Sequence, residues 1–168
     1  MANGIIFAKG HLIADGAGPG GADVEFGELQ DCSFEVRDTT KEARGPDSVF
    51  PLAREIAERS LTFRASYLKV YAQGLALLTG GTVSYADDKT TISVGKESLP
   101  STFKAVLKSP SDGSEIELVL YKISATNLTL PFAMRDFSIP NFEAEILVDE
   151  DNDDKVCDII LPGYQSVN

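Results

Sequence analysis

Residues 26–38, with the sequence FGELQDCSFEVRD, alternate polar and apolar side chains with a period of two. This period puts neighbouring side chains on opposite faces of an extended chain, so the stretch predicts a strand with one wetted face and one buried face. The wetted face would carry Asp31, Ser33, Glu35 and Arg37, and the buried face would carry Gln30, Cys32, Phe34 and Val36.

A second alternating stretch covers residues 53–65. Its β-branched and aromatic content favours a strand in its second half. The polar positions are Glu58, Ser60, Thr62 and Arg64, and the opposite positions are Ala57, Leu61, Phe63 and Ala65. The polar faces of the two stretches match in kind, and neither contains a large apolar residue.

Between these strands lie residues 39–51, TTKEARGPDSVFP, in which Gly45-Pro46 and Pro51 interrupt regular structure. The sequence therefore predicts a loop of about a dozen residues, longer than most connections within a domain, and long ordered loops are commonly functional. Its charges have both signs, which suits contact with a complementary neighbour better than catalysis. The loop residues predicted to contact a neighbouring chain are Thr39, Thr40, Lys41, Glu42, Ala43, Arg44, Gly45, Pro46 and Asp47.

A helix is predicted over residues 66–79, beginning at Ser66 as a cap and ending at Gly80-Gly81. Its stripe of Tyr67, Tyr71, Leu75 and Leu78 is expected to pack on the core. Three further pairs of strands are expected, around Asp87-Asp88-Lys89, around Ser111-Asp112-Gly113, and around the acidic turn near the C-terminus.

These elements predict a mainly β fold, an antiparallel β-sandwich or barrel of about seven or eight strands with one flanking α-helix and a long inter-strand loop. At 168 residues and 18.1 kDa, the chain suits a single domain. Within it we expect an N-terminal arm or loop region over residues 1–25 and a β core over residues 26–161.

The chain carries 26 acidic and 15 basic residues, a net charge of −11. This argues against a protein that grips phosphates, because such proteins need Lys and Arg to displace counterions. Residues 141–158 alone hold eight acids and one base, so most of the excess lies near the C-terminus. No apolar run reaches the roughly 18 residues of a membrane span, and no secretory signal or membrane insertion is expected.

Candidate catalytic and metal-binding groups are few. His11 is the one histidine, and we interpret it as a surface or interface residue. Cys32 and Cys157 match no metal-site spacing, and both are expected to be buried free thiols. Residues 16–21, GAGPGG, satisfy the G-x-G-x-x-G pattern, but no helix pattern follows, so a loop is expected.

Two acidic motifs are interpreted as surface features and not as metal-binding or catalytic sites. Asp149, Asp151 and Asp153 open like a calcium loop, but Asp154 and Ile160 stand where an EF-hand needs Gly and Glu, so a solvated turn is expected. Glu143 and Glu145 share one strand face and suit a solvated face or subunit contact better than glycosidase chemistry. We expect no enzyme activity, catalytic residue, metal or cofactor.

The order of parts in residues 27–81, GELQDCSFEVRDTTKEARGPDSVFPLAREIAERSLTFRASYLKVYAQGLALLTGG, resembles the central region of tail tube proteins of tailed bacteriophages. These proteins are similar in fold to the tubes of contractile secretion machines. The family pattern is a Gly-x-Leu-x-x-Cys/Val strand, a Lys-Glu-x-x-Gly loop ending near a Pro, and a strand leading into a helix. The Asp112-Gly113 hairpin and the Asp136-Phe137 step also resemble the family, and the likeness extends over residues 26–161.

The resemblance implies a structural virion protein that forms six-membered rings stacked into a hollow tube, the conduit for genome delivery. Its partners would be further copies of itself, tape-measure, tail-terminator and baseplate or tip proteins, a sheath where the tail contracts, and double-stranded DNA that passes without specific binding. The protein would be located in the virion tail after assembly in the host cytoplasm. Residues 53–56, AREI, depart from the more basic run of many members, which leaves the charge pairing at that contact open.

In such a ring we expect one sheet of each subunit to join an inner barrel whose lining is wetted. The predicted lumen residues are the two polar faces, Asp31, Ser33, Glu35, Arg37, Glu58, Ser60, Thr62 and Arg64.

Two alternatives remain open. One is a monomeric β-sandwich or barrel that binds a small ligand or carbohydrate, although the absence of Trp would leave stacking on a sugar to Tyr or Phe. The other is a different virion structural protein, such as a head-tail completion or capsid-decorating protein.

Overall fold

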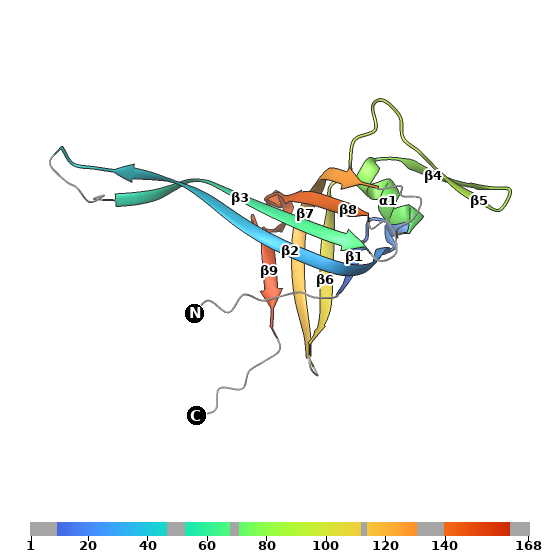
Figure 1. The fold of residues 1–168 in the computed structure, drawn as a ribbon, viewed down its shortest axis with the longest axis horizontal. Coiled ribbons are helices and arrows are strands. Elements are labelled where there is room, and N and C mark those ends of the chain that lie inside the picture. The colour runs from blue at the N-terminus through green and yellow to red at the C-terminus, as the bar shows by residue number, and fades with distance from the viewer. Residues whose placement is uncertain (1–9, 47–52, 68–70, 112–113, 131–139, 162–168) are drawn as a thin grey trace, which may run out of the picture.

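The computed structural model describes residues 10–46, 53–67, 71–111, 114–130 and 140–161 (Figure 1). The described chain is mainly β. Its strands are β1 (Gly10–Asp15), β2 (Val24–Ala43), β3 (Ala53–Tyr67), β4 (Thr82–Ala86), β5 (Lys89–Ser93), β6 (Phe103–Ser111), β7 (Ser114–Thr129), β8 (Asn141–Ile146) and β9 (Cys157–Ile160). One α-helix, α1 (Ala72–Thr79), and two short 3-10 turns, Pro19–Gly21 and Glu150–Asn152, complete the described elements.

The strands form one seven-stranded antiparallel sheet in the order β6-β1-β2-β3-β8-β7-β9, and β4 and β5 pair separately. An additional pairing of β6 with β7 joins six of the strands into a closed circuit. In Figure 1, β2, β3 and β8 cross over β6, β7 and β9 as two layers. The predicted fold class, an antiparallel β-sandwich or barrel with one flanking helix, is confirmed.

Aromatic rings from both layers form the centre of the core. The ring centroids of Phe26 and Phe103 are 5.3 Å apart, and Phe142 lies 6.2 Å from Phe26 and 5.8 Å from Phe63. All four side chains are buried. Such offset and tilted contacts add to the stabilisation from burial itself, so these rings hold the two layers together.

The N-terminal part of the core differs from the prediction. β1 lies inside the sheet, between β6 and β2, and its Leu12 and Ala14 side chains are buried. The sequence predicts an N-terminal arm or loop over residues 1–25, but Gly10–Asp15 within this region form a core strand. The stretch is only six residues long, so its alternation is too short to stand out in the sequence.

Thr39–Ala43, at the start of the loop predicted over residues 39–51, belong to strand β2, while residues 47–51 lie outside the described residues. β2 and β3 stay paired out to Ala43 and Ala53, and the resulting ribbon projects well beyond the two layers (Figure 1). We call the paired segments Val36–Ala43 and Ala53–Leu61, with residues 44–46, the arm. Strand β2 does end just before Gly45-Pro46, at Ala43, which is later than the end of the alternating pattern at Asp38.

The helix is shorter than predicted. It begins at Ala72, with Tyr71 in an extended conformation before it, and Ser66 belongs to β3 instead of capping the helix. The Ser66 hydroxyl donates to Oδ1 of Asn141 on β8 at 2.7 Å. The predicted core stripe holds only in part, since Leu78 is buried while Tyr71 is exposed. The predicted stop is correct: Gly80 caps the helix in the left-handed conformation.

The strands at the C-terminal end do not pair with each other as predicted. β7 lies between β8 and β9 and pairs with both. The acidic turn between β8 and β9 contains the 3-10 turn Glu150–Asn152 and a β-bridge between Asp149 and Lys155. By contrast, β4 and β5 form the predicted hairpin, whose turn residues Asp87 and Asp88 both have positive φ.

Candidate functional site

The two predicted polar faces lie side by side on one surface of the sheet. Arg64 pairs with Ser33, Thr62 with Glu35, Ser60 with Arg37 and Glu58 with Thr39, while Asp31 pairs with Ser66. Directly opposite residues of an antiparallel pair have side chains on the same face. All eight residues predicted for the lumen therefore share one face, with Arg37, Glu58 and Ser60 on the arm and the others on the body of the sheet.

This polar face extends further than predicted, over β8 and β7. Opposite β3, the face continues with Asn141, Glu143 and Glu145 on β8 and then with Ser124, Asn127 and Thr129 on β7. The alternation of residues 141–146 marked Glu143 and Glu145 as a solvated face but gave no sign of which strand they would adjoin. We call this four-stranded surface of β2, β3, β8 and β7 the polar face.

A chain of ion pairs crosses the polar face. Arg37 contacts Glu35 at 3.0 Å, Glu35 contacts Arg64 at 3.2 Å, and Arg64 contacts Glu143 at 3.1 Å. The hydrogen bond that Arg64 donates to Glu143, followed by the charge of Glu143, raises the pKa of Arg64. The pairs balance each other, yet the face as a whole stays acidic, with Asp31, Glu35, Glu58, Glu143 and Glu145 against Arg37 and Arg64.

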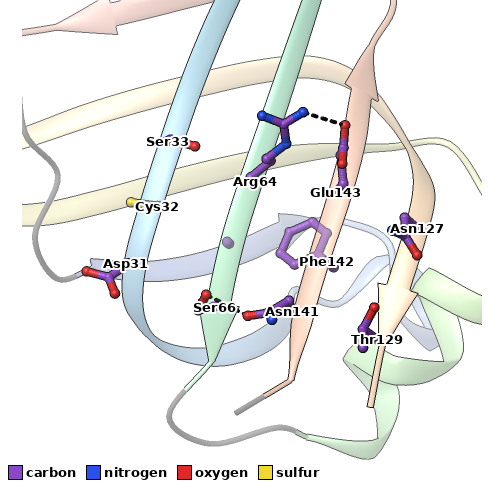
Figure 2. Close-up of a pocket in the computed structure, with 11 residues that line it drawn as sticks. Asp31, Cys32, Ser33, Arg64, Ser66, Asn127, Thr129, Asn141, Phe142 and Glu143 are labelled. Atoms are coloured by element: carbon purple, nitrogen blue, oxygen red, sulfur yellow. Dashed lines mark hydrogen bonds and ion pairs between the residues drawn. The ribbon is translucent and has the colours of Figure 1, made fainter. Parts of the chain in front are cut away.

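A hollow of about 380 Å³ lies in the polar face (Figure 2). Asp31, Ser66 and Asn141 line one end, and Arg64 and Glu143 lie farther along, joined by a hydrogen bond. Every group in this lining that can carry charge is Asp, Glu or Arg, apart from the thiol of Cys32. The hollow therefore offers mainly polar contacts, and its aromatic lining residue, Phe142, is buried in the core.

The thiol of Cys32 is held in its protonated form. Burial, followed by the charge of Asp31, raises its pKa to about 11. Burial also raises the pKa of Cys157, and no disulfide joins the two half-buried cysteines. A protonated thiol is a poor nucleophile and metal ligand, so neither side chain suits covalent chemistry at neutral pH.

The arm carries most of the residues predicted for subunit contact. Thr39 to Ala43 lie in β2, Arg44 to Pro46 follow it, and Asp47 lies outside the described residues. Arg59 donates to both carboxylate oxygens of Asp38, at 2.7 and 2.9 Å. Farther out, Glu42 accepts from Arg54 at 2.5 Å and from Arg44 at 3.1 Å. The Arg59–Asp38 and Arg54–Glu42 pairs connect the two strands of the arm, where none of the buried core residues lies.

Strand edges are open on both sides of the polar face. β1 pairs with β2 only as far as Leu29, and β6 pairs with β7 only as far as Ile123. Within the described residues, no strand pairs with the outer edge of β2 from Ser33 to Ala43 or with that of β7 from Thr126 to Thr129. Unpaired edges are templates for pairing with another chain, so both sides of this sheet can accept a strand.

The remaining sequence candidates lie apart from the polar face. His11 is exposed on β1, and the Gly-rich residues 16–21 form a turn with a short 3-10 segment. Among the residues that the structure describes, no three His, Cys, Asp or Glu side chains gather closely enough to hold a metal ion. The same residues contain no helix with the length and apolar character needed to cross a membrane.

Comparison of the sequence with protein-family models and with curated proteins finds no match.

Proposed function

We propose that this chain is a structural protein of the bacteriophage tail tube type, which assembles into stacked six-membered rings for genome delivery. The observation that carries the proposal is the polar face, a four-stranded sheet surface lined with polar side chains, whose outer strand edges are unpaired among the described residues. A sheet of this kind can be continued by the same sheet of the next subunit. Repeating one such heterologous contact closes a ring when the rotation between subunits divides a full turn.

The shape of the arm also supports assembly. A two-stranded ribbon standing away from its core is marginally stable alone, and a contact with another subunit would give it burial. The arm exposes Val36 and Ile56, each 49% accessible, besides its charged side chains. Apolar side chains exposed along such a projection favour a role in binding over a purely solvated one.

The acidic character of the polar face suits a channel for DNA. Carboxylates lining a passage repel phosphates over a distance comparable with the Debye length of about 8 Å at physiological salt. The ion pairs of Arg37 and Arg64 with Glu35 and Glu143 occupy the bases that would otherwise grip the backbone. DNA could therefore slide along the face without sequence-specific or tight contact.

Negative-stain electron microscopy of the purified chain, combined with light scattering after size exclusion, tests the proposal. Rings or tubes of uniform diameter are the expected result. A monodisperse monomer at high protein concentration, with neither rings nor tubes, would contradict it.

The hollow of the polar face favours the second candidate, a monomeric protein that binds a small polar ligand. Its volume of about 380 Å³ and its lining of hydroxyls, amides and carboxylates would admit a sugar or a similar molecule. Titration of the monomer with a panel of mono- and disaccharides, followed by nuclear magnetic resonance, would distinguish this candidate. Saturable shifts centred on Ser66, Asn127 and Asn141 would favour it over the tube.

A further inference from the structure

A groove runs beside α1 on the side of the β4–β5 hairpin. One hollow, of about 390 Å³, lies between the 17–19 turn, α1 and β4, and a second, of about 420 Å³, lies by the start of α1. Gln73 and Tyr85 line both hollows, so the two adjoin at these side chains. We call the combined feature the helix groove.

The helix groove has an apolar floor and an acidic rim. Ala76, Leu77 and Val83 contribute to its lining, and Tyr85 stands 67% exposed beside it. Asp23 and Glu25 supply the charges at the end near α1, and no Lys, Arg or His takes part in the lining of either hollow. The chemistry that fits is an aliphatic side chain accompanied by a positive charge.

The arm presents that chemistry. Arg54 and Ile56 lie two residues apart on one face of β3, and Ile56 is 49% exposed. Residues 41–56 are balanced in charge, with Lys41, Arg44 and Arg54 against Glu42, Asp47 and Glu55, so the positive charge beside Ile56 is that of Arg54. The Arg54 guanidinium and the acidic rim of the groove are complementary in charge on the same molecule.

The positions of the two features exclude an internal contact. The arm extends to one end of the long axis of the molecule, while α1, β4 and β5 lie at the other end (Figure 1). An arm can therefore reach a helix groove only on another copy. A projection at one end and a groove at the other produce a head-to-tail contact, which repeats from copy to copy.

We propose that the helix groove is the seat for the arm of a neighbouring copy, with Ile56 on the apolar floor near Tyr85 and Arg54 near Asp23 and Glu25. This inference rests on the proposed assembly of the chain and adds the receiving surface. The groove takes side chains of the arm end, since about 390 Å³ accommodates a few side chains and not a whole ribbon.

Disulfide crosslinking between two differently tagged chains tests the contact. One chain carries Ile56→Cys, and the other carries Tyr85→Cys; both positions are exposed, so both variants should fold. The control mixture replaces the second chain with Val148→Cys, a position that is 50% exposed and outside the groove. The wild-type chain under the same oxidant reports any contribution of Cys32 and Cys157.

The expected result is a mixed disulfide dimer at least about tenfold more abundant with Tyr85→Cys than with Val148→Cys, as an oriented contact raises effective concentration. Electron microscopy of the same samples separates the two proposals. Rings or tubes without this excess would overturn the seat and leave the proposed function standing. The excess without rings or tubes would support the seat and contradict the tube, while the absence of both would overturn both.

Discussion

Gly74 of α1 packs directly against Phe26 of β2. A Cβ atom on Gly74 would lie 2.8 Å from Cδ1 and 3.2 Å from Cα of Phe26, both closer than ordinary contact. Phe26 is itself held between Phe103 and Phe142, so its ring has little room to move. This contact sets how closely α1, and with it the helix groove, approaches the sheet.

We therefore expect Gly74→Ala to destabilise the protein. Overpacking a core costs about 1–3 kcal/mol, and the better helix propensity of Ala returns about 1 kcal/mol. A net loss of up to about 2 kcal/mol should appear in urea unfolding. Gly95→Ala is the control, because its nearest neighbour lies at an ordinary 3.5 Å. A Gly74→Ala protein as stable as the wild type would show that the helix can shift at no cost.

Shortening the arm should abolish assembly without unfolding the sheet. Thr40 and Ile56 are directly paired, so an Asn-Gly turn inserted between them in place of residues 41–55 would close a two-residue hairpin. The core rings lie well away from this change, and far-ultraviolet circular dichroism and the unfolding midpoint should be retained. Electron microscopy should show no tubes. Normal tubes from this variant would mean that the arm end makes no necessary contact.

Much of the fold could be predicted from alternation alone. The period-two patterns of residues 26–38 and 53–65 identify β2 and β3, and their shared polar face follows from the register. The turn residues Asp87 and Asp88 identify the β4–β5 hairpin because both adopt positive φ. These features are local, and local chemistry determines them.

The features that sequence reasoning missed depend on contacts distant along the chain. The arm strands continue through charged residues because Asp38 pairs with Arg59 and Glu42 with Arg54, partners separated by up to 21 positions. Likewise, Ser66 has the chemistry of a helix cap, but its hydroxyl bonds to Asn141, 75 positions away. A cap and a cross-strand hydrogen bond use the same side chain, and only the tertiary structure decides between them.

Acid should loosen the arm. Hydrogen bonds from Arg59 lower the pKa of Asp38 below its ordinary 3.8, and those from Arg54 and Arg44 lower the pKa of Glu42 below 4.5. A lowered pKa in the folded state stabilises the arm above those ordinary values and ceases to do so as the pH falls through the lowered ones. Hydrogen exchange of the arm amides, corrected for intrinsic rates, should therefore rise as the pH falls through the lowered pKa values of Asp38 and Glu42, since protonation removes the pairs.

The variant Arg59→Gln is the control for this pH effect. It lacks the partner of Asp38, so its arm should exchange faster at neutral pH and show a smaller further increase in acid. Equal protection of the wild-type arm at neutral pH and in acid that protonates Asp38 and Glu42 would contradict the role of these ion pairs.

Cys32 should resist alkylation in the folded protein. With its pKa raised to about 11 from an ordinary 9.0, the folded chain at about pH 8 holds roughly 100-fold less Cys32 thiolate than the denatured chain. Iodoacetamide labelling followed by mass spectrometry should show at least that ratio of rates. Because the pKa is raised, the buried thiol favours folding below about pH 9, and this contribution is lost as the pH rises toward 11. Rapid labelling of the native protein would place Cys32 in water.

Reversing charge on the polar face should make tubes retain DNA. Glu35 is a poor site for this test, because it contacts both Arg37 and Arg64, and a Lys there would gather three bases. The test variant combines Asp31→Lys with Glu58→Lys, and the control combines Glu97→Lys with Glu150→Lys; each changes the charge by four units per subunit. Glu97 lies between β5 and β6, and Glu150 lies in the turn between β8 and β9, so both are outside the polar face.

Both double variants should still form tubes, since all four positions are exposed. Only the Asp31 and Glu58 pair should bind DNA, with an affinity that falls steeply as salt rises, because phosphate contacts release counterions. Sedimentation of tubes with labelled double-stranded DNA at two salt concentrations measures this. Equal binding by both double variants would mean that the polar face does not line the passage, and aggregation of the Asp31 and Glu58 pair alone would place those side chains at subunit contacts.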